Sequence, residues 1–436
     1  MMSIIMYMVM MIPMSFIKGS WVLNQLLYLF LYMMVLVLDF NCFFSKISYF
    51  LGIDGFSYNL ILLSLLISSL MIISMRLTKK SSMYMFINWS LSFFLLMIFS
   101  SLNFLYMYIS FEFVLVPLLI LILGWGYQPE RLMAGMYLFF YTVLVSLPLL
   151  ILIMKIYSGS GSLFFDYLKY NSTFFLYHFI LVFVFMVKLP MYLVHFWLPK
   201  AHVQAPVSGS MILAGLMLKI GGYGLIRIMY MYEYMYMSYS FLWFSLSMVG
   251  SLLIGIVCLI QGDIKCLIAY SSVSHMGMVI MGLMTMSNWG LMGSFLLMLG
   301  HGFCSSGMFY MANLFYLRTS SRSFFINKGL MIYMPSCSMF WFLLCSFNMS
   351  CPPSLNFISE LMILSSMMQF WFTSLFFFIG VSFICACFSY YLYSYSQHGL
   401  YHNLYSFSII NLSEFLCLFM HLIPLLFYPL MMMSLN

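Results

Sequence analysis

The chain has 436 residues, of which 65% are hydrophobic and only 6% are charged, and its mean hydropathy is +1.08. Soluble domains contain about 45–50% apolar and about 25% charged residues, so the composition excludes a soluble fold, a disordered chain and a disulfide scaffold. Its 16 basic and 9 acidic residues leave a formal charge of +7, and the basic residues stand singly between long apolar runs, which indicates membrane orientation rather than nucleic-acid binding. Because the apolar runs are continuous and do not alternate as in a membrane β-barrel, we expect an all-α polytopic membrane protein.

Apolar runs bounded by polar residues, proline or glycine predict about fourteen membrane-spanning helices, each near the length that crosses a bilayer. The first run has no Arg-rich transit peptide and no cleavage motif, so we expect it to stay as the first span. No joint is long enough for a separate soluble domain, and any chemistry is therefore expected inside the membrane. In chain order the predicted spans are Met2–Ile17, Trp21–Leu38, Ile53–Met75, Met83–Phe99, Phe104–Leu123, Leu132–Ile153, Phe174–Trp197, Val207–Ile226, Ser240–Ile260, Ile264–Met286, Trp289–Phe315, Met334–Met367, Phe370–Tyr393 and Leu412–Leu430.

Basic residues are distributed unevenly among the joints. Ten follow odd-numbered spans and four follow even-numbered spans, which predicts that the odd joints lie inside and that both termini lie on the outer side of the membrane. The ten are Lys18, Arg76, Lys79, Lys80, Arg131, Lys200, Lys265, Arg318, Arg322 and Lys328, and the four are Lys46, Lys155, Lys169 and Arg227.

Prolines interrupt two of the predicted spans. Pro190 follows Lys188 in the seventh span, which Pro199 closes, and Pro352 and Pro353 interrupt the twelfth. Proline removes a backbone donor and clashes with the preceding turn, so both helices must unwind or kink. A separation of five spans favours two inverted five-helix repeats with an ion path at mid-membrane, although two unrelated kinks are the alternative. The expected organisation is residues 1–82 with three helices, 83–232 and 233–395 as the repeats, and 396–436 with the last helix.

Four ionisable residues fall deep in predicted spans: Glu112, Lys188, Lys219 and Glu360. A charge at the bilayer centre costs about 2.5–3.5 kcal/mol even on a lenient scale, so we expect these side chains to face the protein interior. Snorkelling to the interface and a purely structural ion pair are the alternatives. Because burial weakens a lysine's hold on its proton and a nearby carboxylate restores it, the set predicts a proton relay. Glu112 would modulate Lys188, Lys219 would carry the proton onward, and Glu360 would accept it.

Histidines are candidates for the gaps in this relay, since their protonation changes near neutral pH. His195 lies two helical turns past Lys188 if that helix continues, and His301 lies deep in the eleventh span; each could instead be a packed, hydrogen-bonded histidine. The residues to which we assign other roles are His202, expected in a joint; His178, His275 and His421, expected to be structural; and Asp54, Glu130 with Arg131, and Asp263 with Lys265, expected to be solvated or helix-capping.

The sequence contains no motif for a metal or a redox cofactor. Its ten cysteines include no CxxC pair, and it has no nucleotide-binding glycine motif after a strand. We therefore expect neither a metal nor a cofactor to be bound by this chain.

Six segments have a distinctive sequence: Leu123–Arg131, Lys188–Ser210, Met217–Gly224, Ala269–Gly277, Pro352–Glu360 and Ser394–Gly399. They resemble the chain 4 family of mitochondrial NADH-ubiquinone oxidoreductase, the antiporter-like subunits in the membrane arm of respiratory complex I, with an arthropod-like character. The resemblance implies fourteen helices with two inverted five-helix repeats. It places the family's glutamate and lysine pair on Glu112 and Lys188, the central lysine on Lys219, the accompanying histidines on His195 and His301, and the terminal acid on Glu360.

The resemblance implies a function that composition alone does not reveal. We expect a proton-translocating subunit of the mitochondrial inner membrane, coupled to NADH oxidation and ubiquinone reduction elsewhere in the complex. Its implied partners are other membrane-arm subunits, including two sister antiporter-like chains, and membrane lipids, while FMN and iron–sulfur clusters belong to other subunits. A stand-alone sodium/proton antiporter and a structural membrane scaffold are the alternatives.

Overall fold

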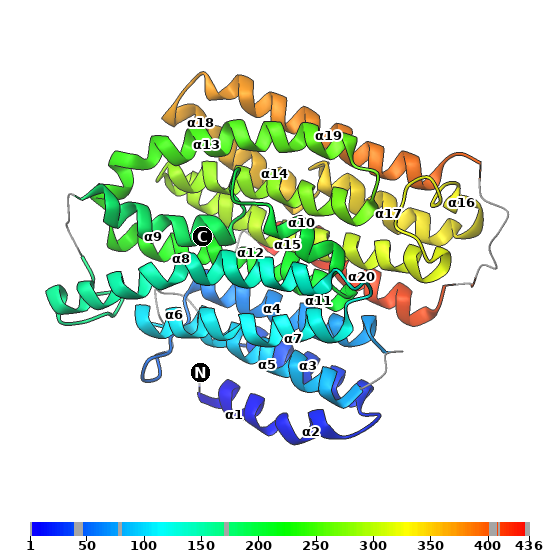
Figure 1. The fold of residues 1–436 in the computed structure, drawn as a ribbon, viewed down its shortest axis with the longest axis horizontal. Helices are drawn as coiled ribbons and strands as arrows, with labels where there is room; N and C mark the ends of the chain where they lie inside the picture. Colours follow the sequence, from blue (N-terminus) through cyan, green and yellow to red (C-terminus); the bar gives the residue numbers. More distant parts are fainter. Residues whose placement is uncertain are drawn as a thin grey trace. The chain divides into compact units, whose positions relative to one another are not determined.

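The computed structural model describes residues 2–38, 47–76, 81–169, 174–400, 408 and 410–431. The described part is helical almost throughout, with isolated β-bridges but no strand (Figure 1). It divides into two compact units, which we describe separately. Unit 1 comprises Met1–Lys188 and Gln204–Ser238, and unit 2 comprises Leu189–Val203 and Tyr239–Asn436.

Unit 1 is a bundle in which successive helices pack against one another, α3 on α4 and α4 on α5. Its deepest elements are α4 and the segment from α11 to α12, which is interrupted by a single π-helical turn, η1. The elements are α1 (Met2–Met10), α2 (Ile12–Phe16), α3 (Trp21–Leu36), α4 (Gly55–Ser74), α5 (Ser81–Ser100), α6 (Phe104–Phe113), α7 (Leu115–Trp125), α8 (Arg131–Ser160), α9 (Phe175–Lys188), α11 (Val207–Ile212), η1 (Leu213–Met217) and α12 (Leu218–Met231).

Unit 2 is built around α15, which packs against α14, α17, α18 and α20. Small residues permit this close approach, since a side chain at Gly293 would crowd α18. The elements are α10 (Trp197–Gln204, assigned to this unit up to Val203), α13 (Glu233–Ile260, assigned from Tyr239), α14 (Ile264–Met284), α15 (Asn288–Thr319), α16 (Leu330–Tyr333), α17 (Pro335–Asn348), α18 (Leu355–Phe370), α19 (Ser374–Gln397) and α20 (Leu412–Met431).

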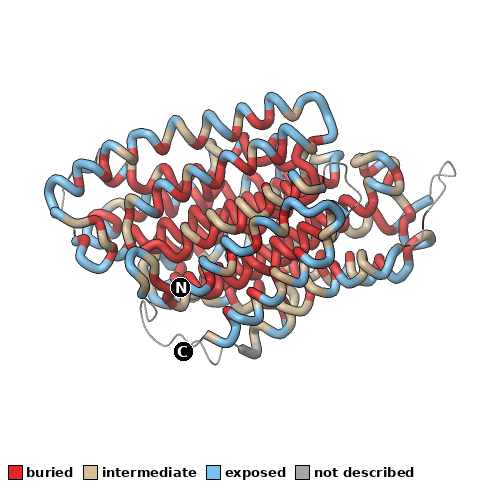
Figure 2. The backbone as a smooth tube through the Cα atoms, turned by 90° about the horizontal axis from the view of Figure 1, so that it is seen from below, coloured by how far each residue is buried: buried red, intermediate tan, exposed pale blue. Residues whose placement is uncertain are grey.

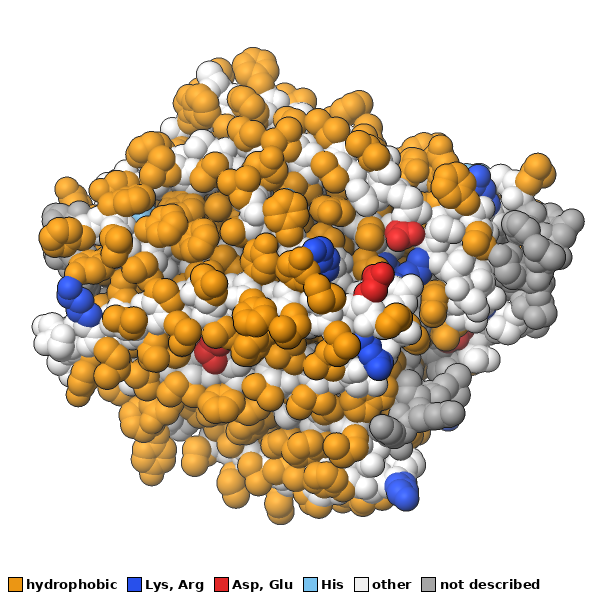
Figure 3. Space-filling view, in the orientation of Figure 1, with side chains coloured by type: hydrophobic (Ala, Val, Ile, Leu, Met, Phe, Trp, Pro, Cys, Tyr) orange, Lys and Arg blue, Asp and Glu red, His pale blue; other side chains and the backbone are white. Residues whose placement is uncertain are grey.

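Helix lengths agree with the expected polytopic membrane protein. Within the described ranges, 10 segments are long and apolar enough to span a membrane, and Met2–Phe16, Trp21–Leu36 and Phe175–Lys188 are shorter apolar segments. The burial of side chains also agrees with a helical membrane protein. Interior helices are buried along their length, while peripheral helices bury one face and expose the other (Figure 2). Hydrophobic side chains cover most of the face seen in Figure 3, with few charges, as expected for a surface in contact with lipid.

Three predicted joint residues are in fact buried in helices. Arg227 lies within α12 and is 1% exposed, and Lys265, at the start of α14, is also 1% exposed. His202 lies within α10 and is 0% exposed. These placements were wrong because a short polar segment between apolar runs can be a helix end covered by neighbouring elements.

The basic-residue count changes only slightly. Removing Arg227 and Lys265 takes one residue from each side, leaving nine against three. Lys155 lies in α8, which continues to Ser160 beyond the predicted end at Ile153. Lys46, Lys79 and Lys80 lie outside the described residues.

Candidate functional site

The predicted break in the seventh span is confirmed in its position but not in its form. Helix α9 ends at Lys188, immediately before Leu189 and Pro190, and the next helix, α10, begins only at Trp197. Between them Leu193 has a φ of 80°, a left-handed conformation that a branched side chain rarely adopts. Pro199 does not close the span, because it lies in the first turn of α10, where proline is tolerated.

Lys188 is buried at this helix end, with 2% of its surface exposed. Its Nζ lies 4.1 Å from the centroid of the Phe111 ring, and within the described part of the chain it has no hydrogen-bond acceptor. Glu112, next to Phe111 on α6, interacts with Lys188 electrostatically but makes no direct ion pair with it among the described residues. The ammonium is thus held by a ring face and a carboxylate at a distance, and its charge is only partly compensated.

Close packing of α9 against α12 holds this arrangement. Gly224 of α12 lies directly under the ring of Phe185, and a Cβ at that position would overlap the ring. Phe185 in turn makes an edge contact with Phe111, with the ring centroids 5.9 Å apart. The absence of a side chain at Gly224 therefore lets α9 approach α12 closely. This approach fixes the position of the Phe111 ring, which faces Lys188.

Lys219 is also buried, with 0% exposed, at the start of α12. Its Nζ donates a hydrogen bond of 2.6 Å to the carbonyl of Ala214, which belongs to the π-helical turn η1. A π turn shifts the backbone hydrogen-bond register, and such turns are frequent at functional sites. Nothing in the sequence pattern indicated this turn.

The predicted break in the twelfth span is also confirmed, between the end of α17 at Asn348 and the start of α18 at Leu355. Glu360 lies in α18 and is 8% exposed. Ser350, inside the break and with a φ of 61°, donates a short hydrogen bond to the Glu360 carboxyl group. The terminal acid is therefore held by the broken segment itself.

His301 lies on α15 with its ring centroid 5.6 Å from that of His275 on α14. Both side chains are 1% exposed. We expected His275 to be structural, but its place beside His301 makes it a candidate member of the same polar path. The sequence offered one signal, since His275 lies in Ala269–Gly277, a segment that carries the family resemblance.

Four further histidines for which we predicted a role lie in packed surroundings. His195 belongs to unit 2, is 5% exposed, and lies against Tyr192 and Tyr270 at centroid distances of 6.0 and 6.1 Å. It is not two helical turns past Lys188, because no helix runs between them. His202 stacks on Phe309 at 4.8 Å. The two others are His178, 6.1 Å from the Tyr236 ring, and His421, whose Nδ1 is 2.7 Å from the carbonyl oxygen of Cys417.

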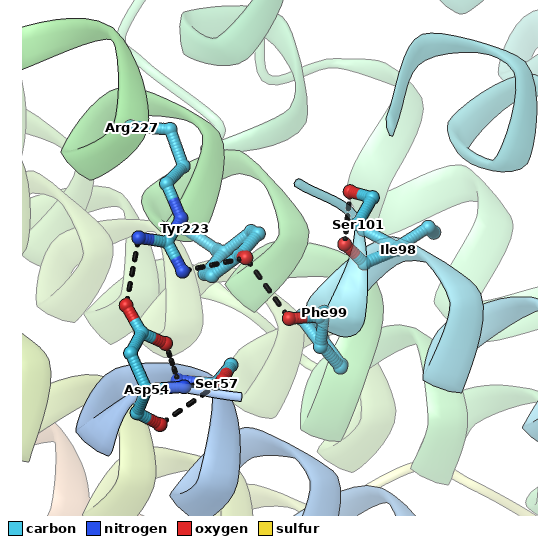
Figure 4. A network of polar contacts seen from close by, with 7 residues as sticks. All are labelled: Asp54, Ser57, Ile98, Phe99, Ser101, Tyr223 and Arg227. Atoms are coloured by element: carbon cyan, nitrogen blue, oxygen red, sulfur yellow. Dashed lines mark hydrogen bonds and ion pairs between the residues drawn. The ribbon is translucent and has the colours of Figure 1, made fainter. Parts of the chain in front are cut away.

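Asp54 and Arg227 form a buried ion pair that the sequence did not reveal (Figure 4). An Oδ2–Nη1 distance of 2.7 Å joins them, and Arg227 also donates to the Tyr223 hydroxyl at 2.8 Å. Tyr223 donates in turn to the carbonyl of Phe99 at 2.9 Å. Asp54 caps α4 as expected, receiving a hydrogen bond from the Ser57 amide, but it is 2% exposed rather than solvated.

The charge of Asp54 depends on these contacts. Burial by itself would disfavour the ionised form of the Asp54 carboxyl group, but the Arg227 guanidinium at 2.7 Å and the hydrogen bond from the Ser57 amide stabilise that form. From the sequence, only the contact between Asp54 and Ser57 could have been predicted, because Asp54-Gly-Phe-Ser57 is a capping pattern.

Other charged groups lie at helix ends. Glu130 accepts a hydrogen bond of 2.9 Å from Gln204, and Arg131 donates to the Gly126 carbonyl at 2.8 Å. Glu130 is exposed, in agreement with the solvated role expected of it, and its side chain makes no capping hydrogen bond to α8. Throughout the described ranges, no group of three histidine, cysteine or acidic side chains is arranged to hold a metal ion.

Two protein families match the chain. Residues 101–389 match the family described as NADH:quinone oxidoreductase/Mrp antiporter, transmembrane region, and residues 1–98 match NADH-ubiquinone oxidoreductase chain 4, amino terminus. Among curated relatives, NADH-ubiquinone oxidoreductase chain 4 of Ceratitis capitata is 48% identical, over 98% of this chain and 97% of that protein. The protein of the same name from Aedes aegypti is 46% identical over 96% of each chain.

The fold also has a counterpart among solved structures. A chain of respiratory complex I from Thermus thermophilus with bound NADH superposes with a TM-score of 0.88, covering 98% of this chain and 95% of that one. The two sequences are 19% identical, so this likeness concerns the fold alone.

Proposed function

Because the chain belongs to the NADH-ubiquinone oxidoreductase chain 4 family, we propose that it is a membrane-arm subunit of respiratory complex I in the inner mitochondrial membrane. In this role it translocates protons through buried Glu, Lys and His side chains, driven by NADH oxidation and ubiquinone reduction in other subunits. It needs no redox centre of its own for this task. Its partners are other membrane-arm subunits, among them the sister antiporter-like chains, and membrane lipids.

The observation that carries the proposal is the environment of Lys188. A buried ammonium without an acceptor is costly in a membrane interior, and a carboxylate within electrostatic reach lowers that cost. Moving Glu112 closer would favour the charged lysine, and moving it away would favour release of the proton. A lysine in this setting is a switch, whereas a lysine locked in a close ion pair would not be.

Onward transfer would use Lys219, the histidines and Glu360. Lys219 is held near the π turn, where a change of backbone register would alter its hydrogen bond to Ala214. In unit 2, His301 has His275 beside it, and Glu360 is held by Ser350. His195 remains a proposed member of the relay.

We also propose the finer membrane topology that the sequence predicted. The support for fourteen spans is the set of 10 long spans, three shorter apolar segments and the broken pair α17 and α18 among the described residues. Residues 83–232 and 233–395 would be the inverted repeats, between 1–82 and 396–436. The basic residues favour both termini on the intermembrane-space side.

Substitution of Lys219 by Ala tests the proposal in the assembled complex. We expect normal assembly, seen as co-migration of this chain with NADH dehydrogenase activity on a native gel, but at least about a hundredfold loss of proton pumping, the scale of losing a proton-transfer group. Lys169→Ala, at an exposed position, is the matched control.

Other outcomes would favour the alternatives. Unchanged proton stoichiometry in the Lys219→Ala complex would support a scaffold role for the buried charges. A native gel in which this chain migrates apart from NADH dehydrogenase activity would instead favour a stand-alone sodium/proton antiporter.

A further inference from the structure

One face of α12 carries a row of polar side chains. Lys219, Tyr223 and Arg227 are spaced four residues apart, so they lie near one another on the helix surface. All three side chains are at most 1% exposed. At 1.5 Å per residue the row extends about 12 Å along the helix.

The far end of this row is closed by the ion pair of Arg227 with Asp54 (Figure 4). The pair joins α12 to the N-terminus of α4, and Tyr223 joins it to the end of α5. A buried ion pair is seldom more stabilising than well-packed apolar residues of the same size, because both ions lose their hydration. Its presence two turns from Lys219 therefore calls for another explanation than stability.

Beyond the pair lies a carboxylate at the surface of unit 1. Asp166 is exposed, and it interacts electrostatically with both Arg227 and Asp54. The neighbouring Phe165 ring lies 6.0 Å from the Arg227 guanidinium and covers it. Partial burial raises the pKa of the Asp166 carboxyl group, although Arg227 acts in the opposite direction. An acidic group thus stands outside the pair, on the solvent side.

We infer that Asp54, Arg227 and Tyr223 are positioning residues of the proton relay. These three residues set the charge on Lys219, and they separate the face of α12 that carries Lys219 from the exposed Asp166. This inference rests on the proposed proton translocation. While Asp54 opposes Arg227, the two charges largely cancel at Lys219, and its ammonium form is tolerated. When the pair opens, the uncompensated guanidinium disfavours that form. None of the three residues needs to carry the proton.

The test compares charge variants of this pair in complex I reconstituted in lipid vesicles. Asp54→Asn leaves Arg227 uncompensated, and we expect proton pumping per assembled complex to fall about tenfold, the effect of a charge about 12 Å away at an effective dielectric of about 20. The double variant Asp54→Asn with Arg227→Gln should restore most of the pumping, and Arg227→Lys should retain it. A role in folding alone would change the yield of complex but not the pumping of each assembled complex.

Two comparisons make the outcome decisive. Glu414→Gln breaks the ion pair with Arg318 at 2.7 Å in unit 2 and should leave pumping unchanged. If Asp54→Asn prevents assembly, Arg227→Gln replaces it, since Ser57 still holds Asp54. Normal pumping by an assembled complex with either single variant overturns the inference. The inference is also overturned if neither single variant assembles and only the double variant does, because the pair would then act in folding alone. If Lys219→Ala pumps normally, the proposed function itself fails.

Discussion

The two broken helices hold their charged residues in different ways. In unit 1, Lys188 is the last residue of α9 and lies on an aromatic ring without a hydrogen-bond acceptor among the described residues. In unit 2, Glu360 lies inside α18, beyond the break, and accepts a hydrogen bond from Ser350 within it. The first charge is loosely held and the second is anchored.

This difference indicates different tasks for the two sites. A group that must change its protonation during each cycle is served by weak, adjustable contacts, because each strong contact favours one charge state. Glu360, as the proposed proton acceptor, also changes its protonation, but the Ser350 hydroxyl can hold its carboxyl group in place in either charge state, as donor or as acceptor. We therefore expect substitutions around Lys188 to affect pumping more than substitutions around Glu360.

The largest effect is expected from Lys188→Met, which keeps most of the length of the unbranched side chain and removes its charge. Loss of a proton-transfer group corresponds to about a hundredfold or greater loss of rate, and we expect that loss in proton pumping by the assembled complex. Lys18→Met, at an exposed position, is the control. Pumping within twofold of normal would assign Lys188 to packing and would remove the contrast between the two breaks.

A smaller effect is expected from Gly224→Ala, because the added methyl group overlaps the Phe185 ring. Overpacking of this kind costs about 1–3 kcal/mol, and moving α9 relative to Phe111 should reduce pumping about tenfold. Gly124→Ala is the control, since nothing lies within 4 Å of a Cβ at that position. Equal effects of both alanines would show that the approach of α9 to α12 does not set the Lys188 site.

The smallest effect is expected from Ser350→Ala, which removes the hydrogen bond to Glu360. A single hydrogen bond contributes about 0.5–1.5 kcal/mol, so we expect pumping to fall about threefold. Ser365→Ala, on an exposed part of α18, is the control. A loss as large as that of Lys188→Met would mean that both charges are equally sensitive, contrary to the comparison.

Much of the architecture could be predicted from local chemistry. Apolar runs defined most helices to within a few residues, and Pro190 and Pro352 marked both interruptions, because proline acts on its own backbone wherever the chain folds. The deep positions of Lys188, Lys219 and Glu360 were equally visible, since each stands inside an apolar run.

The contacts between distant segments could not be predicted in this way. Arg227 was interpreted as a joint residue because Asp54, its partner, lies far away in the sequence. His275 resembled a packed histidine until α14 and α15 brought it beside His301. The π turn before Lys219 leaves no composition signal, because Leu, Ala and Met favour helices and a single glycine such as Gly215 is common in membrane helices.

Residue types and their order along the chain suffice to predict a bundle of membrane helices with buried charges and two breaks. This is because hydrophobic burial and the effect of proline on the backbone depend on residue type and on near neighbours in the chain. The packing of separate helices is needed to know which charge faces an aromatic ring, which is anchored by a hydrogen bond and which forms an ion pair. Those outcomes depend on distances of a few ångströms between side chains from separate helices, and electrostatic energy changes steeply over such distances in a medium of low dielectric.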